Sequence, residues 1–124
     1  MNNQAAFIFT NDDYINTTTI FGGIKKTIIS KDFRGGRVSN IFGATELDFT
    51  NADIAGVAVL DISQCFGEVK IAVPGDWWIE SDTTQVFATV EDKRLNVMNT
   101  YDSKKILVLR GTSFFGVVEV LSSL

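Results

Sequence analysis

Histidine is absent from the 124-residue sequence, and its absence excludes several kinds of catalytic and metal site. There is no Ser-His or Cys-His pair, no imidazole metal ligand and no side chain whose ordinary pKa lies close to neutrality. A glycosidase-type carboxylate pair stays open, because Glu46 and Asp48 can share one face of a strand. Asp76 and Glu80 form a second such pair, but chance pairs are common among 15 acidic residues. We therefore expect a protein that is not an enzyme and has no catalytic residue, cofactor or metal site.

Cysteine and long apolar runs are also scarce. Cys65 is the only cysteine, so the chain has no intrachain disulfide, and a reducing compartment is favoured. No run approaches the roughly 18 apolar residues of a membrane-spanning helix. The first residues lack the basic start and the apolar stretch of a signal peptide. We expect a soluble, cytoplasmic chain, unless a targeting portion is missing from it.

Basic residues are in the minority, with 11 against 15 acidic residues and a net charge of -4. This balance argues against a nucleic-acid-binding surface. Five of the 11 nevertheless fall within 13 positions: Lys25, Lys26, Lys31, Arg34 and Arg37. The cluster is either a solvated face or a site for phosphate or an acidic partner, and Lys31, Arg34 and Arg37 are candidates for an interaction surface.

A repeated pair, phenylalanine followed by a small residue, is the main motif of the sequence. It occurs as Phe21-Gly22, Phe42-Gly43, Phe66-Gly67, Phe87-Ala88 and Phe115-Gly116. The intervals are 21, 24, 21 and 28 residues, and an apolar residue precedes the phenylalanine each time. Repeats of 20 to 30 residues indicate a solenoid, in which each unit buries its apolar face against its neighbours.

Alternating residues between the repeated pairs predict strands rather than helices. Val69, Ile71 and Val73 alternate with Glu68, Lys70 and Ala72, and clusters of Gly, Asp, Asn and Pro separate such stretches. The sequence predicts an all-β, single-domain β-solenoid resembling a right-handed parallel β-helix, with about five short coils and little or no helix. Residues 1–19 are expected to be a lead-in segment and residues 20–124 the solenoid domain.

The register of the repeat makes three structural predictions. Phe21, Phe42, Phe66 and Phe87 are expected to form one buried interior column, flanked by Ile20, Ile41, Cys65 and Val86, and the small residue after each permits a corner or a close backbone approach. Trp77 is expected to face the core with Ile79, while Trp78 points outward with Glu80 and is a candidate partner contact. The fourth residue after each aromatic is charged, and stacking predicts a ladder of Lys25, Glu46, Lys70, Glu91 and Glu119.

Two stretches resemble a known family. "IFGGIKKTIISKDFRGGRVSNIFGATELDFTNADI" and "VLDISQCFGEVKIAVPGDWWIE" are similar to the C-terminal domain of the LiaF family, the cell-wall-active antibiotic response proteins of bacteria. The likeness spans residues 20–94; it departs at Phe87-Ala88, and the last 30 residues match less clearly. The resemblance implies a regulatory domain at the cytoplasmic face of the membrane. Family members carry transmembrane helices ahead of this domain, so this chain is either a soluble portion that reaches the membrane only through a segment absent from it, or a relative that works without those helices. The resemblance also implies a protein partner, namely the sensor histidine kinase of an envelope-stress two-component system.

Two other classes of function are weighed against this one. A self-assembling structural module is the alternative, because the ends of a solenoid leave unpaired strand edges that a second copy can join. A carboxylate-based enzyme acting on glycans is a remote alternative. Growth into open-ended oligomers with concentration would distinguish assembly from regulation.

Overall fold

Nine β-strands make up the described part of the chain in the computed structural model, which covers residues 6–86, 88–94 and 104–123, and no helix occurs among these residues. The strands are β1 (Ala6–Thr10), β2 (Tyr14–Thr19), β3 (Gly23–Ile28), β4 (Gly35–Asp48), β5 (Val57–Ala72), β6 (Trp78–Val86), β7 (Thr89–Asp92), β8 (Ile106–Phe114) and β9 (Gly116–Leu121). All pairings between them are parallel. The predicted all-β solenoid is confirmed.

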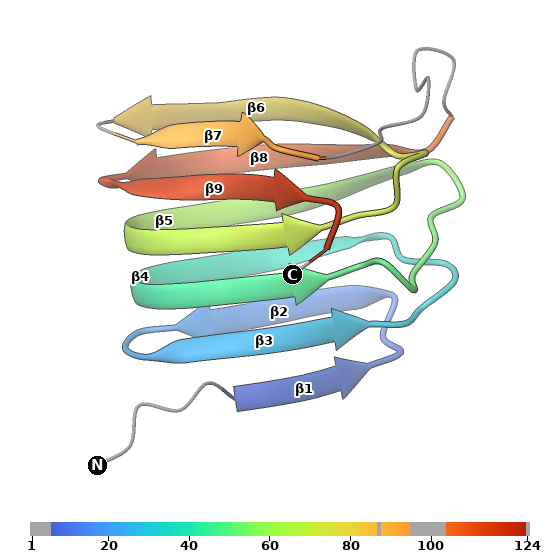
Figure 1. The fold of residues 1–124 in the computed structure, drawn as a ribbon, viewed down its shortest axis with the longest axis horizontal. Helices are drawn as coiled ribbons and strands as arrows, with labels where there is room; N and C mark the ends of the chain where they lie inside the picture. The colour runs from blue at the N-terminus through green and yellow to red at the C-terminus, as the bar shows by residue number, and fades with distance from the viewer. Residues whose placement is uncertain (1–5, 87, 95–103, 124) are drawn as a thin grey trace.

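Each coil has two strands that meet at a corner. In Figure 1, β2 runs behind from right to left, and β3 returns in front from left to right before the chain rises, which is a right-handed turn. β4 and β5 each bend through such a corner without a break, so that one long strand contributes to both faces. The first face holds β2, β6, β8 and the first halves of β4 and β5, and the second face holds the remaining strands. Five two-strand coils result, as predicted, with β1 added beside β3 on the second face.

The repeat alignment is confirmed by the strand register. Phe42 pairs with Phe66, Gly43 with Gly67, and Gly67 with Gly116, so the phenylalanine-glycine pairs lie on top of one another. The predicted lead-in segment contains β1 and β2, which pair with β3 and β4.

The order of the coils in space differs from their order in the sequence. β8 lies between β5 and β6, and β9 lies between β5 and β7, so the C-terminal coil is inserted beneath the coil that precedes it in the chain (Figure 1). The inward residues explain this arrangement. β8 contributes Leu107 and Leu109, which are fully buried between two neighbouring strands. In β6, Ser81 and Thr83 stand opposite Leu109 and Gly111, and such polar residues suit the last coil, which is covered on one side only.

Aliphatic columns fill the interior between the two faces. Leu47, Ile71 and Val120 stack in successive coils, all fully buried. At the loop side the rings of Phe33, Phe49 and Trp77 pack against one another, with centroid distances of 4.8 and 5.8 Å. The prediction for the tryptophans is confirmed, because Trp77 is fully buried, whereas Trp78 is exposed over 39% of its surface.

The inward column of Leu47 has a charged residue on either side of its apolar part. Lys26 stands next to Leu47, and the pKa of its amino group is lowered. Burial is the main cause, and the nearby Asp12 carboxylate offsets only part of it. At the other end stands Asp92, which accepts hydrogen bonds from the Arg94 guanidinium at 2.9 Å.

Within the described residues, no helix is long and apolar enough to cross a membrane.

Candidate interaction surface

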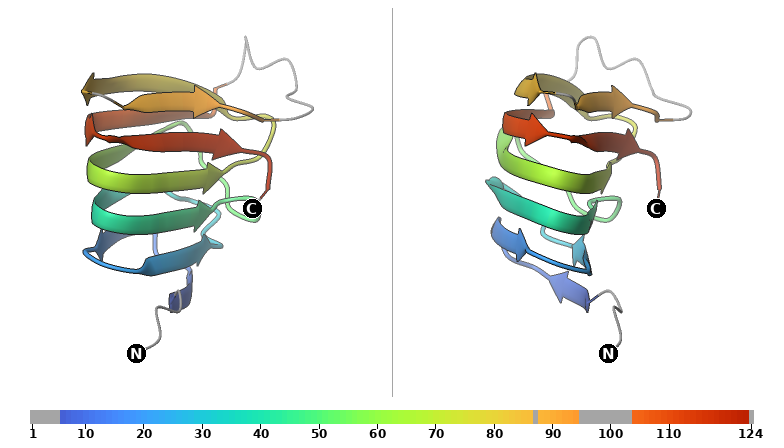
Figure 2. Two further views of the ribbon diagram at one scale, coloured as in Figure 1. Left: turned by 60° about the vertical axis from the view of Figure 1, so that its left-hand side comes forward. Right: turned by 90° about the vertical axis from the view of Figure 1, so that its left-hand side faces the viewer.

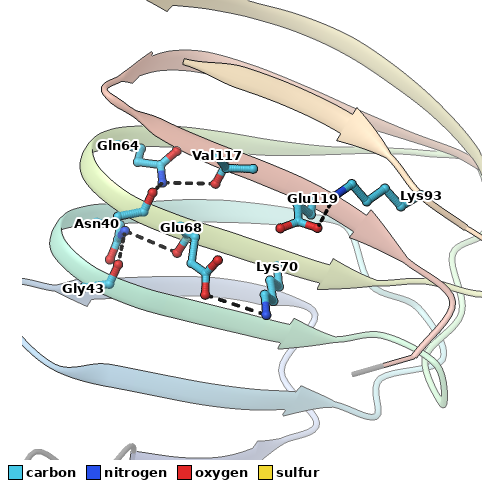
Figure 3. A network of polar contacts seen from close by, with 9 residues as sticks. Asn40, Gly43, Gln64, Glu68, Lys70, Lys93, Val117 and Glu119 are labelled. Atoms are coloured by element: carbon cyan, nitrogen blue, oxygen red, sulfur yellow. Dashed lines mark hydrogen bonds and ion pairs between the residues drawn. The ribbon is translucent and has the colours of Figure 1, made fainter. Parts of the chain in front are cut away.

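Side-chain amides fill the inside of the corners. Asn40 donates to the carbonyl oxygen of Gly43 at 3.1 Å and to that of Glu68 in the next coil at 3.4 Å. Gln64 repeats this contact one coil further on, donating to the carbonyls of Gly67 at 2.8 Å and Val117 at 3.2 Å (Figure 3). Both side chains are buried, and their amide groups find hydrogen-bond partners among the carbonyl oxygens of the corners.

These amides leave no room for the phenylalanines inside, and the prediction of a buried aromatic column is wrong. Phe21 is exposed over 78% of its surface, and Phe42 and Phe66 over 44% and 39%. They do stack as a column, with parallel rings 5.5 and 5.0 Å apart, but outside the corner. Phe87 lies outside the described residues, and Phe115 continues the column from Phe66 at 5.2 Å.

The exposed column is one half of a continuous apolar surface. Three of the residues that directly precede these phenylalanines are also large and exposed: Ile20, Ile41 and Phe114. Cys65, the only cysteine, is partly exposed between them in the register. We call these eight residues the corner ridge: Ile20, Phe21, Ile41, Phe42, Cys65, Phe66, Phe114 and Phe115. It follows the edge of the solenoid that faces the viewer on the right of Figure 2. An apolar patch that spans four coils makes this ridge the candidate interaction surface.

A shallow groove runs beside the corner ridge on the first face. In every coil a serine or threonine stands three positions before the phenylalanine of the repeat. In spatial order these residues are Thr18, Ser39, Ser63, Thr112 and Thr84. Ile41, Cys65 and Phe114 of the ridge form its other wall. The surface therefore places the apolar corner ridge next to a row of hydroxyl groups that can form hydrogen bonds with a binding partner.

The ring geometry restricts what the corner ridge can bind. Neighbouring rings are within 11° of parallel and face one another, so the column presents mainly ring edges to the solvent. Sugar rings and cations bind aromatic faces, and the faces between neighbouring rings of this column are covered. An apolar side chain of a protein partner makes good contact with a row of ring edges.

The predicted charge ladder is present on the second face. In the strand register, Lys25 stands opposite Glu46, Glu46 opposite Lys70, and Lys70 opposite Glu119. The inserted coil places Glu119 next to Glu91, where two like charges meet. The Nζ atom of Lys93 lies 3.2 Å from both carboxylates. Lys93 donates a hydrogen bond to each of them, and these bonds raise the pKa of its amino group, the bond to Glu91 most and that to Glu119 next. Figure 3 shows Lys93 against Glu119 at the end of this row.

A second ladder, which sequence reasoning missed, lies on the first face. Its members in spatial order are Arg37, Asp61, Arg110 and Asp82. Their charges alternate only because the last two coils are exchanged, since the order along the chain places Asp82 directly after Asp61. Opposite charges on neighbouring strands favour this coil order over the sequential one.

We expect Glu46→Lys to lower the stability at low ionic strength by roughly 1 kcal/mol, because it places three lysines in adjacent rungs. High salt screens the repulsion and should restore most of the loss. Thermal unfolding at two salt concentrations measures the effect. An unchanged melting temperature at low salt would show that the ladder does not contribute to the register.

The predicted basic candidates do not gather with Trp78. Lys31 donates to the carbonyl of Asn51 at 2.6 Å, and Arg34 pairs with Asp32 at 2.8 Å in the same loop. Arg37 is an exposed member of the first-face ladder on β4, whereas Trp78 begins β6, and β5 and β8 lie between these two strands. Trp78 stands beside Ile106 and is therefore separate from both the loop and the corner ridge.

The acidic pairs considered for catalysis have other partners. Glu46 stands between two lysines of the ladder, and Asp48 accepts hydrogen bonds from the backbone and hydroxyl of Thr50 at 2.9 and 2.6 Å. Asp76 lies 3.4 Å from Lys105. Within the part of the chain that the structure describes, no group of three or more acidic or cysteine side chains is arranged to hold a metal ion.

The corner ridge had a detectable signal in the sequence. The residue two positions before each phenylalanine is polar in all five repeats: Thr19, Asn40, Gln64, Gln85 and Ser113. When a polar residue stands at an inward-pointing position of the strand, its side chain occupies the inside of the corner. The aromatic two positions later then has to lie outside.

Comparison with protein families identifies one match. The model of the family described as cell wall-active antibiotics response LiaF, C-terminal, matches residues 20–120. This range contains all five repeated phenylalanine pairs and all eight residues of the corner ridge. No curated protein and no solved structure matches the chain.

Proposed function

Because the chain belongs to the LiaF-like C-terminal family and is thereby associated with the response to cell-wall stress, we propose that it is a non-catalytic regulatory domain. The domain modulates a two-component sensor histidine kinase by direct contact. The observation that carries this proposal is the corner ridge. Its apolar residues are exposed along four coils, although the interior next to them holds polar amides.

Several features support a binding role. The centre of the ridge is well fixed, because the corners that carry Phe42 and Phe66 are held by backbone hydrogen bonds and by the amides of Asn40 and Gln64. A rigid surface loses little conformational entropy on binding. The groove of hydroxyl residues beside it can orient a partner segment that contacts the ring edges. The proposal places the domain at the cytoplasmic face of the membrane, where a single free cysteine such as Cys65 is normal.

A pull-down of the full-length protein with the sensor kinase of the same envelope-stress system tests the proposal. We expect the parent protein to retain the kinase and the double variant Phe42→Ser/Phe66→Ser to lose it. Val57→Ser is the matched control, because Val57 is an exposed apolar residue of β5 outside the ridge. Retention of the kinase by the double variant would contradict the proposal.

Trp78 is the second candidate contact and needs its own variant. If Trp78 also touches the kinase, Trp78→Ala should weaken binding by about 2 kcal/mol, as is typical of an interface tryptophan. Unchanged affinity would limit the interface to the corner ridge. The measurement is a binding isotherm of each variant at one salt concentration.

A further inference from the structure

The two ends of the solenoid differ in charge. The last coil carries Glu80 and Asp82 on β6 and Glu91 and Asp92 on β7. Arg94, whose side chain is 4% exposed, binds Asp92 and the carbonyl oxygen of Trp77 at this end. Charged residues on an edge strand prevent pairing with another chain, so this end is protected.

The first end has no such protection. β1 (AFIFT) and β2 (YINTTT) contain no charged residue. Among the described strands, β1 pairs only with β3 and β2 only with β4, so each has an open edge. Phe7 and Phe9 of β1 are exposed over 72% and 75% of their surfaces, and Tyr14 of β2 over 64%.

The first end also carries half a coil. β1 occupies the position next to β3 on the second face. No described residue occupies the corresponding position next to β2 on the first face. Figure 1 shows β1 alone at this level, while every other level has a strand on each face.

We propose that β1 of a second copy of the chain fills this position and that the protein is a closed two-fold dimer. A two-fold axis parallel to the strands, passing through the level of β1, exchanges the two faces and keeps the strand directions. β1 of the other copy then lies beside β2 and antiparallel to it, since β1 and β2 run in opposite directions (Figure 1). The same operation places β1 of the first copy beside β2 of the second. One complete coil forms from the two half coils.

The side chains fit this arrangement. In β1, Phe7 and Phe9 point outward, in line with the outward residues of β2, which begin with Tyr14. Ile8 belongs to the inward column of Lys26 and would meet Ile8 of the other copy across the interior. Aromatic and β-branched pairs on neighbouring antiparallel strands are stabilising. Because the other end is charged, association stops at two copies.

Sedimentation equilibrium over a range of concentrations tests the dimer. We expect the parent to reach twice its 13.7 kDa mass at micromolar concentration. Asn16→Lys/Thr18→Lys adds charge to the open edge of β2 and should raise the dissociation constant at least tenfold. The matched control is Thr84→Lys, because Thr84 ends the same outward column on β6 and should leave the dimer intact. Both sites are exposed, and circular dichroism checks that each variant is folded.

Three results would overturn the proposal. They are a parent that stays monomeric, equal effects of Asn16→Lys/Thr18→Lys and Thr84→Lys on the dissociation constant, and growth beyond two copies. Hydrogen exchange of the β2 amides identifies the occupant, because protection by a second copy depends on protein concentration. Protection that is equal at all concentrations would mean that the chain itself covers β2. Kinase binding through the corner ridge is measured separately, so failure of the dimer leaves that proposal standing.

Discussion

Gly67→Ala is expected to lower the free energy of unfolding by at least about 3 kcal/mol, a value at the upper end of the range for single substitutions. A Cβ on Gly67 would overlap the carbonyl oxygen of Gly43 in the neighbouring coil. The clash is with backbone, so no side-chain rotation relieves it. Gly67 also has a φ of 110°, which an L-residue adopts only with strain. Urea denaturation measures the loss.

Two other glycines separate the causes of this loss. Gly22 has a φ of 90° but no atom within 4 Å of a Cβ, so Gly22→Ala measures the backbone strain alone, about 1 to 2 kcal/mol. Gly56 has neither a positive φ nor a neighbour, and Gly56→Ala should change the stability little. Equal losses at Gly22 and Gly67 would show that close stacking of the corners contributes nothing.

Gln64→Leu is expected to destabilise the protein by roughly 2 to 4 kcal/mol, because it removes the partners of three buried groups while keeping the volume of the side chain. The carbonyls of Gly67 and Val117 lose their donor, and Ser113 Oγ loses the acceptor that it binds at 2.7 Å. Two of these groups belong to the inserted coil, so its docking on β5 should weaken first.

The control for this prediction is Gln85→Leu. Gln85 occupies the same column in the last coil but is exposed, and within the described part of the chain its side chain contacts the hydroxyl of Thr83 at 3.2 Å. Its replacement should change the stability by about 0.5 kcal/mol or less. A loss at Gln85 as large as that at Gln64 would contradict the role assigned to the corner amides.

Local patterns in the sequence predict the solenoid well. The aromatic-glycine spacing gives the stacking of Phe42 on Phe66, and the alternation of polar and apolar residues gives the buried Trp77 and the exposed Trp78. The ladder of Lys25, Glu46 and Lys70 follows from the same alignment. These features depend on register alone, which a period-2 pattern specifies strongly.

The phenylalanine-glycine spacing by itself does not predict features that depend on competition between parts of the chain. The apolarity of the phenylalanines favours their burial, but the amides of Asn40 and Gln64 occupy the inside of the corner, where they donate hydrogen bonds to its carbonyl oxygens. The exchange of the last two coils requires comparing Leu107 and Leu109 with Ser81 and Thr83 as interior residues. That comparison concerns segments that are not neighbours in the chain.

The most direct measurement of the central claim is the affinity of the purified protein for the sensor kinase in lipid nanodiscs, by titration calorimetry. We expect Phe42→Ser/Phe66→Ser to raise the dissociation constant at least 30-fold, about 2 kcal/mol, since two central residues of the corner ridge are lost. Val57→Ser should leave it unchanged. An affinity of the double variant equal to that of the parent would contradict the claim that the corner ridge is the regulatory surface.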